Sequence, residues 1–430
     1  ATGVHVNFAP VVDVNSNPLN PVIGSRSFGS SVERVSNMGT AYAKGMQDQG
    51  VLATAKHFPG HGDTDADSHK TLPSILHNRQ RLDSIELSPF QRLTNEGVGA
   101  MMAAHLFIPA LDSVPGRPST LSPLIIDTLL RQEIKFQGLV FTDAMTMKGF
   151  SEFATTTTPH ADALIAGNDV LLFPTDPPTA IAEILTAIES RRIDSLSIAQ
   201  KCRRVLAAKS WSKAMNPAAG HYDSNRAESI HRELLARSLT VVKNRGRSLP
   251  WGQQVNQVES IFIGWKGQPH KRFNQDAEKV MGKTSVFSGQ SLTDSDFINE
   301  AKSFIPAALA KEPDWLVIHL GGTSNSVSKQ HGIPNDVIDQ LNWTLALANE
   351  RNIPTAVVVY GSPYLLNRLE RCAALTKALI IAYQDDDRTI DAVAQALTGA
   401  GMAGGTLPVS VGAFPEGHGL PWLGGVRLGF

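Results

Sequence analysis

One short stretch of the chain, residues 56–69, concentrates the side chains that could carry out chemistry. It reads Lys-His-Phe-Pro-Gly-His-Gly-Asp-Thr-Asp-Ala-Asp-Ser-His, with one lysine, three histidines and three aspartates. Imidazoles that titrate near neutral pH, gathered with carboxylates in an irregular loop, indicate either proton transfer or metal binding. Which of the two applies decides the function.

The spacing within this stretch does not favour a metal site. The Asp-x-Asp-x-Asp run at 63–67 matches the start of a calcium loop, but Ser68 and Ser74 stand where such a loop needs glycine and a bidentate glutamate. The two histidines at 57 and 61 could bind zinc from a helix, which the proline and glycine between them forbid. We therefore expect neither a metal nor another cofactor.

Proton transfer is better supported, because Asp67 and His69 form a possible acid–base pair. A carboxylate two residues from an imidazole can accept its N–H, select its tautomer and stabilise the imidazolium. Asp143 supplies a third component, since it follows the apolar run 139–142, where a carboxylate without a role is costly. A helix N-cap is the alternative role for Asp143. Acyl transfer has no candidate, because the chain lacks a Gly-x-Ser-x-Gly elbow and neither cysteine stands in a nucleophile's context.

The elements that must position these residues alternate between strand and helix. Near-continuous apolar runs predict parallel strands covered on both faces, at 4–12, 51–55, 100–104, 139–142 and 169–173. Polar residues directly follow four of these runs: Asp13, Lys56 with His57, His105, and Asp143. Barrels of the (β/α)8 type and open doubly wound sheets both place their chemistry at the carboxyl ends of parallel strands. The sequence therefore predicts that these side chains share one rim.

Helix signals lie between the strand runs. Residues 30–33 read as a capping box, followed by apolar residues at helical spacing up to Gly50. Ser122 and Pro123 provide a cap and a first-turn proline for a helix over 124–133. Further helices are predicted at 177–191 and 196–208. The alternation indicates a parallel α/β fold.

A chain of 430 residues is too long for one compact core, so two domains are expected. We place the first at 1–210, a polar linker at 211–226 and a second domain, an α/β sandwich of three layers, at 227–430. The second domain is predicted to contain helices at 228–239, 335–350 and 389–398, and strands at 259–264, 315–320, 355–360 and 377–382. Its glycine-rich segment at 399–405 lacks the pattern of a phosphate-binding loop, which argues against nucleotide binding.

Composition excludes some classes of partner. The formal net charge of −1 gives no electrostatic reason to expect nucleic acid. No apolar run approaches the roughly 20 residues that a membrane-spanning helix needs. The two cysteines, Cys202 and Cys372, form no disulfide framework and leave the compartment open.

At its chemically active residues the chain resembles a known family, the family 3 glycoside hydrolases, and within it the bacterial β-N-acetylglucosaminidase branch. The matching motifs occur in the same order and spacing, at 7–13, 24–28, 56–62, 67–69 and 141–143. The resemblance in the catalytic part covers about residues 1–210, and the rest is similar to the sandwich domain of two-domain members. It implies a (β/α)8 TIM-type barrel followed by an α/β/α sandwich.

The resemblance also implies a mechanism and a substrate. Asp143 would attack the anomeric carbon, and His69, held by Asp67, would act as acid and then as base. Arg26, Lys56 and His57 match positions that hold the sugar in this family. The implied substrate is a terminal β-linked N-acetylglucosamine, typically on muropeptides from peptidoglycan turnover, which favours the bacterial cell envelope or periplasm over the cytoplasm.

One departure from the family pattern matters. The family barrel has three strands before the one that matches 4–12, so we expect an upstream segment to complete the barrel. Three alternatives stay open: a β-glucosidase of the same family, a phosphorylase that uses inorganic phosphate, and an inactive carbohydrate-binding relative. A glucosidase would use a glutamate from the second domain as acid, against which the pair Asp67 and His69 argues.

Overall fold

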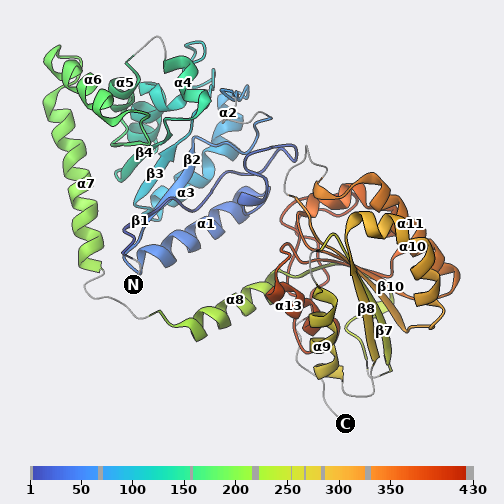
Figure 1. The fold of residues 1–430 in the computed structure, drawn as a ribbon. Helices are drawn as coiled ribbons and strands as arrows, with labels where there is room; N and C mark the ends of the chain where they lie inside the picture. Colours follow the sequence, from blue (N-terminus) through green and yellow to red (C-terminus); the bar gives the residue numbers. More distant parts are fainter. Residues whose placement is uncertain are drawn as a thin grey trace. The chain divides into compact units, whose positions relative to one another are not determined.

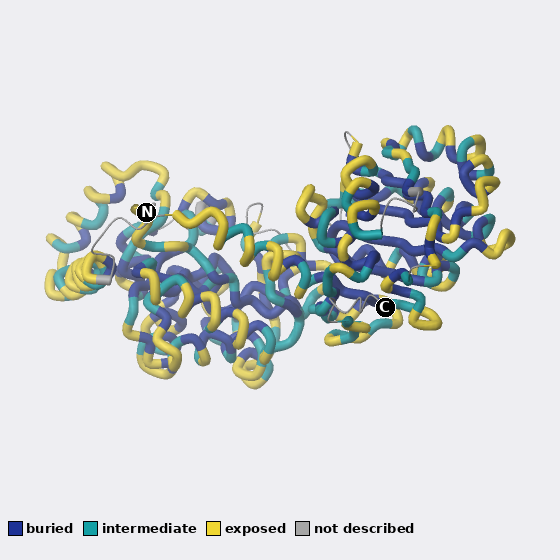
Figure 2. Tube along the Cα trace, turned by 90° about the horizontal axis from the view of Figure 1, so that it is seen from below, coloured by how far each residue is buried: buried dark blue, intermediate teal, exposed yellow. Residues whose placement is uncertain are grey.

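The chain folds into two compact units, Ala1–Tyr222 and Asp223–Phe430. The structure is a computed structural model, and it describes residues 3–65, 71–154, 158–215, 222–252, 254–265, 268–281, 286–324 and 331–422. Figure 1 shows a layered α/β arrangement in each unit. In both units the central strands are deeply buried, whereas the helices expose their outer faces (Figure 2).

The first unit contains one parallel sheet whose five strands lie side by side in chain order. The strands are β1 (Val6–Asn7), β2 (Leu52–Phe58), β3 (Ala100–Ala103), β4 (Leu139–Ala144) and β5 (Val170–Leu172). A doubly wound sheet reverses its strand order at some point, whereas a barrel adds each strand on the same side of the one before. The order β1 to β5 is therefore that of a barrel segment, as predicted.

Helices follow the strands as the alternation predicts. The longer ones are α1 (Val32–Gln47), α3 (Ser88–Asn95), the π-helix η4 (Leu124–Glu133), α5 (Pro159–Ala166), α6 (Pro177–Glu189) and α7 (Ser195–Met215). Shorter turns are η1 (Gly24–Arg26), α2 (Arg79–Arg81), η2 (Leu82–Glu86), η3 (Ser119–Leu121) and α4 (Lys148–Ala154). Helix α1 packs against α3 and β2, where buried Val35 and Leu93 belong to the same core.

Two local predictions need correction. The capping box over 30–33 is not formed, because Ser31 and not Ser30 is the N-cap of α1, and its hydroxyl accepts from the Arg34 amide. The strand expected over 4–12 is regular only at Val6–Asn7. Pro10 within that run has no N–H to donate to a strand ladder.

The second unit contains a six-stranded sheet in the order β6-β11-β10-β9-β7-β8. Its strands are β6 (Thr240–Asn244), β7 (Gln257–Ile263), β8 (Val286–Leu292), β9 (Trp315–Leu320), β10 (Thr355–Val359) and β11 (Ala378–Ile381). All neighbouring pairs are parallel except β6 with β11. The order reverses around β7, which marks a doubly wound sheet.

Helices cover both faces of this sheet (Figure 1). One face packs on α10 (Asp294–Leu309) and α11 (Asn335–Glu350), and the other on α9 (Pro269–Met281) and α13 (Asp387–Leu397). Side chains alternate along each strand, so Ile261 and Ile263 join the first core while Phe262 joins the second. The three-layer prediction for this unit is confirmed.

Several elements of the second unit were not predicted: β6, β8, α9 and α10. Strands β6 and β8 are the two edges of the sheet and are short or rich in polar residues, so they lack the apolar run of a central strand. Helix α7 extends through Met215, and α8 (Ser224–Ser238) begins before residue 227, so both ends of the expected linker are helical.

Candidate functional site

The carboxyl ends of neighbouring strands in the first unit carry the predicted polar residues. Lys56 and His57 lie near the end of β2, Asp143 lies near the end of β4, and His105 comes just after β3. Asp13 follows Val11, which forms a parallel bridge with Lys56. Because parallel strands end at the same edge of a sheet, these side chains come together on one rim.

Asp13 makes several hydrogen bonds to the residues of this rim. Its side chain is fully buried, and its carboxylate accepts hydrogen bonds from the His57 amide at 3.1 Å and from the His61 amide at 2.7 Å. The Nδ1 atom of His57 lies 2.7 Å from Asp13 Oδ2. Burial alone would raise the pKa of Asp13, but the interactions with His57 and His61 lower it below its usual value. Asp13 is therefore an ionised acceptor that ties the loop after β1 to β2.

Arg26 and His57 are in direct contact. The Nη2 atom of Arg26, in η1, lies 3.2 Å from His57 Nε2. The Arg26 side chain is exposed, whereas His57 is buried. Two of the three residues expected to hold a sugar thus lie side by side, one of them reachable from solvent.

Lys56 and Asp143 belong to the same electrostatic cluster. Burial and the charge of Arg26 lower the pKa of Lys56, although Asp143 and Asp13 act in the opposite direction. Burial would raise the pKa of Asp143, but the charges of His57 and His105 at the acidic pH where these rings are protonated, together with the Ala144 amide, keep that pKa below its usual value. Oδ1 of Asp143 accepts from the Ala144 amide at 2.8 Å, and Oδ2 accepts no hydrogen bond from the described residues. An ionised oxygen without a donor suits a nucleophile.

His105 supports the backbone at the end of β4. It is buried, its Nδ1 lies 2.6 Å from the Thr120 hydroxyl, and its Nε2 lies 3.1 Å from the Ala144 carbonyl oxygen. A carbonyl oxygen can only accept, so Nε2 carries the proton. Burial lowers the pKa of His105. A neutral His105 therefore holds the peptide that follows the Asp143 carboxylate.

The proposed acid–base pair, Asp67 and His69, lies outside the described residues. Nearby, Asp63 is paired with His77 and also lies 3.6 Å from Arg81. In the described ranges, no group of three or more His, Cys, Asp or Glu side chains is arranged to hold a metal ion.

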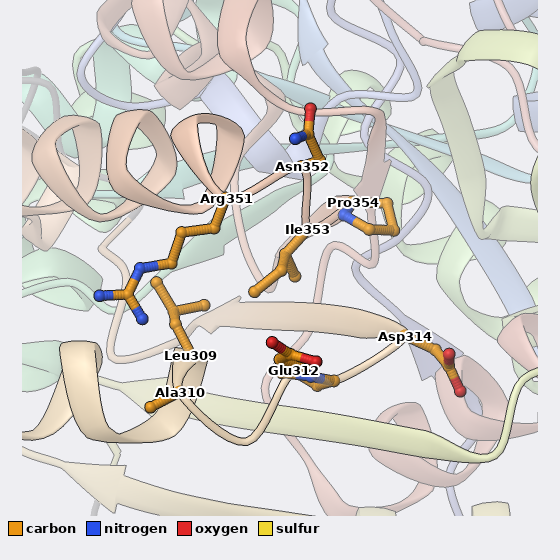
Figure 3. Close-up of a pocket in the computed structure, with 9 residues that line it drawn as sticks. Leu309, Ala310, Glu312, Asp314, Arg351, Asn352, Ile353 and Pro354 are labelled. Carbon is orange, nitrogen blue, oxygen red and sulfur yellow. The ribbon is translucent and has the colours of Figure 1, made fainter.

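A cavity of about 740 Å³ lies in the second unit, at the amino ends of β9 and β10 (Figure 3). Its charged lining residues are Glu312, Asp314 and Arg351. The Asp314 carboxylate accepts from the amides of Asn256 and Gln257, which gives it a structural role. The chemistry of parallel sheets is found at the carboxyl ends of their strands, so this cavity is not the candidate active site.

The sequence did not assign roles to Asp13, His61 and His105, although Asp13 and His105 were placed on the rim. His61 is buried, and its Nδ1 lies 2.8 Å from the Thr64 hydroxyl. The sequence signal for Asp13 and His105 was a polar type at a strand end, and the signal for His61 was its place in the histidine-rich stretch 56–69. The side-chain partners of Asp13 and His105 are 44 and 15 residues away along the chain, so spacing could not identify them.

Comparisons with known proteins show what this chain is similar to. Residues 1–208 match the family model described as the glycosyl hydrolase family 3 N terminal domain. Beta-hexosaminidase A of Pseudoalteromonas piscicida is 29% identical, over 95% of this chain and 74% of that protein. A beta-hexosaminidase of Methylococcus capsulatus is 35% identical over 50% of this chain, which spans 66% of that protein.

Solved structures give the same result for both units. A family 3 β-N-acetylglucosaminidase from Paenibacillus sp. aligns with a TM-score of 0.73 and 29% identity, covering 96% of this chain and 77% of that one. The beta-glucoside phosphorylase BglX aligns with a TM-score of 0.74 but only 20% identity, covering 96% of this chain and 75% of that one, and so shows the fold alone. No helix in the described ranges is both long and apolar enough to cross a membrane. Residues 1–208 thus belong to glycosyl hydrolase family 3, and this chain is a glycoside hydrolase.

Proposed function

We propose that this protein is a retaining exo-β-N-acetylglucosaminidase that removes terminal β-linked N-acetylglucosamine. The observation that carries the proposal is the state of the Asp143 carboxylate: its pKa is lowered, and its Oδ2 accepts no hydrogen bond from the described residues. This carboxylate belongs to the same cluster as Arg26, Lys56 and His57. The choice of sugar is supported by the similarity to beta-hexosaminidases and to a β-N-acetylglucosaminidase. Muropeptides from peptidoglycan turnover are the substrate class we propose.

In the first step, an Asp143 carboxylate oxygen attacks the anomeric carbon, and the bond from that carbon to the leaving oxygen breaks. His69, held by Asp67, gives its proton to the leaving oxygen. In the second step, His69 takes a proton from water while the water oxygen displaces Asp143 from the anomeric carbon. Two displacements at one carbon restore its original configuration.

Arg26 and Lys56 can only donate hydrogen bonds, so they suit sugar oxygens. In the glycosylation step an electron pair of the Asp143 carboxylate forms the ester bond, and the negative charge that passes to the leaving oxygen is neutralised by the proton from His69. Cationic groups next to Asp143 favour its charged form and keep it ready to attack at neutral pH.

The proposal is tested with 4-nitrophenyl N-acetyl-β-glucosaminide. We expect Asp143→Ala to lower kcat by at least about 1,000-fold. His69→Ala should release one equivalent of nitrophenolate in a burst and then stall, because the glycosyl-enzyme lacks its base. The exposed Asp127→Asn on η4 is the control and should keep full activity.

Two further readouts separate the alternatives. Proton NMR of the first-formed product should show the β anomer; a first-formed α anomer would exclude retention. Sugar 1-phosphate that forms only when phosphate is added would instead indicate a phosphorylase. Unchanged turnover in Asp143→Ala would overturn the assignment of the nucleophile.

A further inference from the structure

We propose that Asp13 is a positioning residue that fixes the tautomer of His57, so that Nε2 of this histidine is the hydrogen-bond acceptor of the sugar-binding cluster. The role of His57 in sugar recognition rests on the proposed function, whereas the tautomer of His57 does not. Asp13 does not contact the rim's outer surface; it acts through His57.

The tautomer follows from the two neighbours of the His57 ring. An ionised Asp13 carboxylate can only accept, so the 2.7 Å contact with Nδ1 requires a proton on Nδ1. A guanidinium can only donate, so the 3.2 Å contact with Arg26 Nη2 requires a lone pair on Nε2. Both conditions are met by one form only, the neutral imidazole with its proton on Nδ1.

Asp13 is held firmly enough to impose this form. Its carboxylate is fully buried and also accepts the His57 and His61 amides, so a rotation of the carboxylate would leave buried donors without partners. The loops that carry these residues are packed backbone to backbone: a Cβ on Gly62 would lie 1.8 Å from the Val14 carbonyl oxygen. The orientation of the His57 ring is thus set by the buried Asp13 carboxylate.

This arrangement gives the sugar-binding cluster both hydrogen-bond donors and a hydrogen-bond acceptor. Arg26 and Lys56 offer only donors, and His57 Nε2 offers an acceptor beside them. Nε2 has a single lone pair, so a sugar hydroxyl that gives its proton to Nε2 replaces the Arg26 contact there, and the hydroxyl oxygen can then accept from the Arg26 guanidinium. A fluorine at the same position can accept weakly but has no proton to give. We therefore expect the protein to reject a deoxyfluoro sugar at the position that faces His57.

The first test is the protonation state of His57 in the full-length chain, measured by nitrogen-15 NMR of labelled histidine. The His57 signal is assigned by its loss in His57→Gln. We expect a neutral ring with the proton on Nδ1 at pH 7, and in Asp13→Asn a shift of population toward the Nε2–H form. A wild-type ring protonated on Nε2 would overturn the proposal, whether or not the variant folds.

The second test compares kcat/KM for 4-nitrophenyl N-acetyl-β-glucosaminide with its 3-, 4- and 6-deoxyfluoro analogues. Wild type should lose about 10- to 100-fold at one of these positions, in line with a lost hydrogen bond to a buried group. Asp13→Asn should be slower on the parent substrate and lose most of that discrimination. Asp112→Asn, another buried carboxylate with an arginine partner, is the control and should discriminate like wild type.

The outcomes separate this inference from the proposed function. If His57 carries its proton on Nδ1 but the protein does not cleave the glucosaminide, the tautomer stands and the substrate assignment fails. If cleavage proceeds while all three fluoro analogues react like the parent, the role of Nε2 as acceptor is wrong.

Discussion

At the scale of single residues, His61 shows how burial changes the pKa of a side chain in the site. Its side chain is almost completely buried next to Asp13, and its ring lies 6.0 Å from that of His57. Burial lowers the pKa of His61 to about 4, even though Asp13 favours the charged form. His61 is therefore neutral at pH 7 and adds no positive charge to the rim there.

The first prediction concerns stability against pH. An unfolded histidine binds a proton near pH 6.5, whereas folded His61 does so only near pH 4, so between these values the unfolded state holds more protons. The contribution of His61 is fully present above pH 6.5 and decreases as the pH falls. Its loss between pH 7 and 4.5 should be about 2 kcal/mol.

Urea unfolding of the first unit at pH 7 and pH 4.5 measures this effect. His61→Gln should flatten the pH dependence by about that amount, although it lowers stability at pH 7 through loss of the bond to Thr64. His5→Gln, a change at an exposed histidine, is the control and should keep the wild-type slope. Equal slopes in His61→Gln and wild type would show that His61 is not buried in its neutral form.

At the scale of elements, the close packing of helix α1 depends on a glycine. Gly39 lies on its buried face, where a Cβ would come within 2.7 Å of Val12 Cγ1, and Val12 immediately precedes Asp13. Val12 is fully buried and β-branched, so it has little freedom to move aside. The close approach of α1 thus supports the loop that carries Asp13.

The second prediction compares the same substitution at two places on α1. Gly39→Ala should destabilise the first unit by about 1–3 kcal/mol, because it overpacks the contact with Val12. Gly45→Ala should stabilise it by about 0.5–1 kcal/mol, because nothing lies within 4 Å of the added methyl group and alanine favours helix. Opposite signs in urea unfolding support this packing; two stabilising changes would contradict it.

At the scale of the whole molecule, each unit has a core of its own. The first unit is built on the barrel segment β1 to β5, and the second on the two cores that sandwich its six-stranded sheet. Phe262 lies in one of the latter cores, fully buried and stacked on His319 at 3.8 Å. A change in one core is therefore expected to act on its own unit.

The third prediction is that Phe262→Ala lowers the stability of the second unit by about 3–5 kcal/mol and leaves the first unit's transition in place. Differential scanning calorimetry should resolve two transitions, of which this variant moves one and Gly39→Ala moves the other. A single transition that shifts with both variants would mean that the units unfold together. Phe262→Leu, which keeps most of the apolar volume, should shift the same transition by less.

The amino-acid sequence by itself determined the kind of elements and their approximate places. The central strands β3, β4, β9 and β10 are near-continuous apolar runs, a pattern typical of strands that are buried on both faces. It also placed the polar residues at the strand ends, since a strand that ends at a rim is followed by side chains that meet water. The edge strands β6 and β8 of the second sheet carry a weaker pattern, and the sequence did not predict them.

Only the tertiary structure decided which residues touch. The reading of alternating strands left a barrel and a doubly wound sheet both open, and the neighbour order of the strands, which no local pattern encodes, separated them. In the same way, the contacts of Asp13 with His57 and of His57 with Arg26 join segments 44 and 31 residues apart. Local residue types specify what each group can donate or accept. The fold specifies which group stands opposite, and that pairing carries the tautomer that we propose for His57.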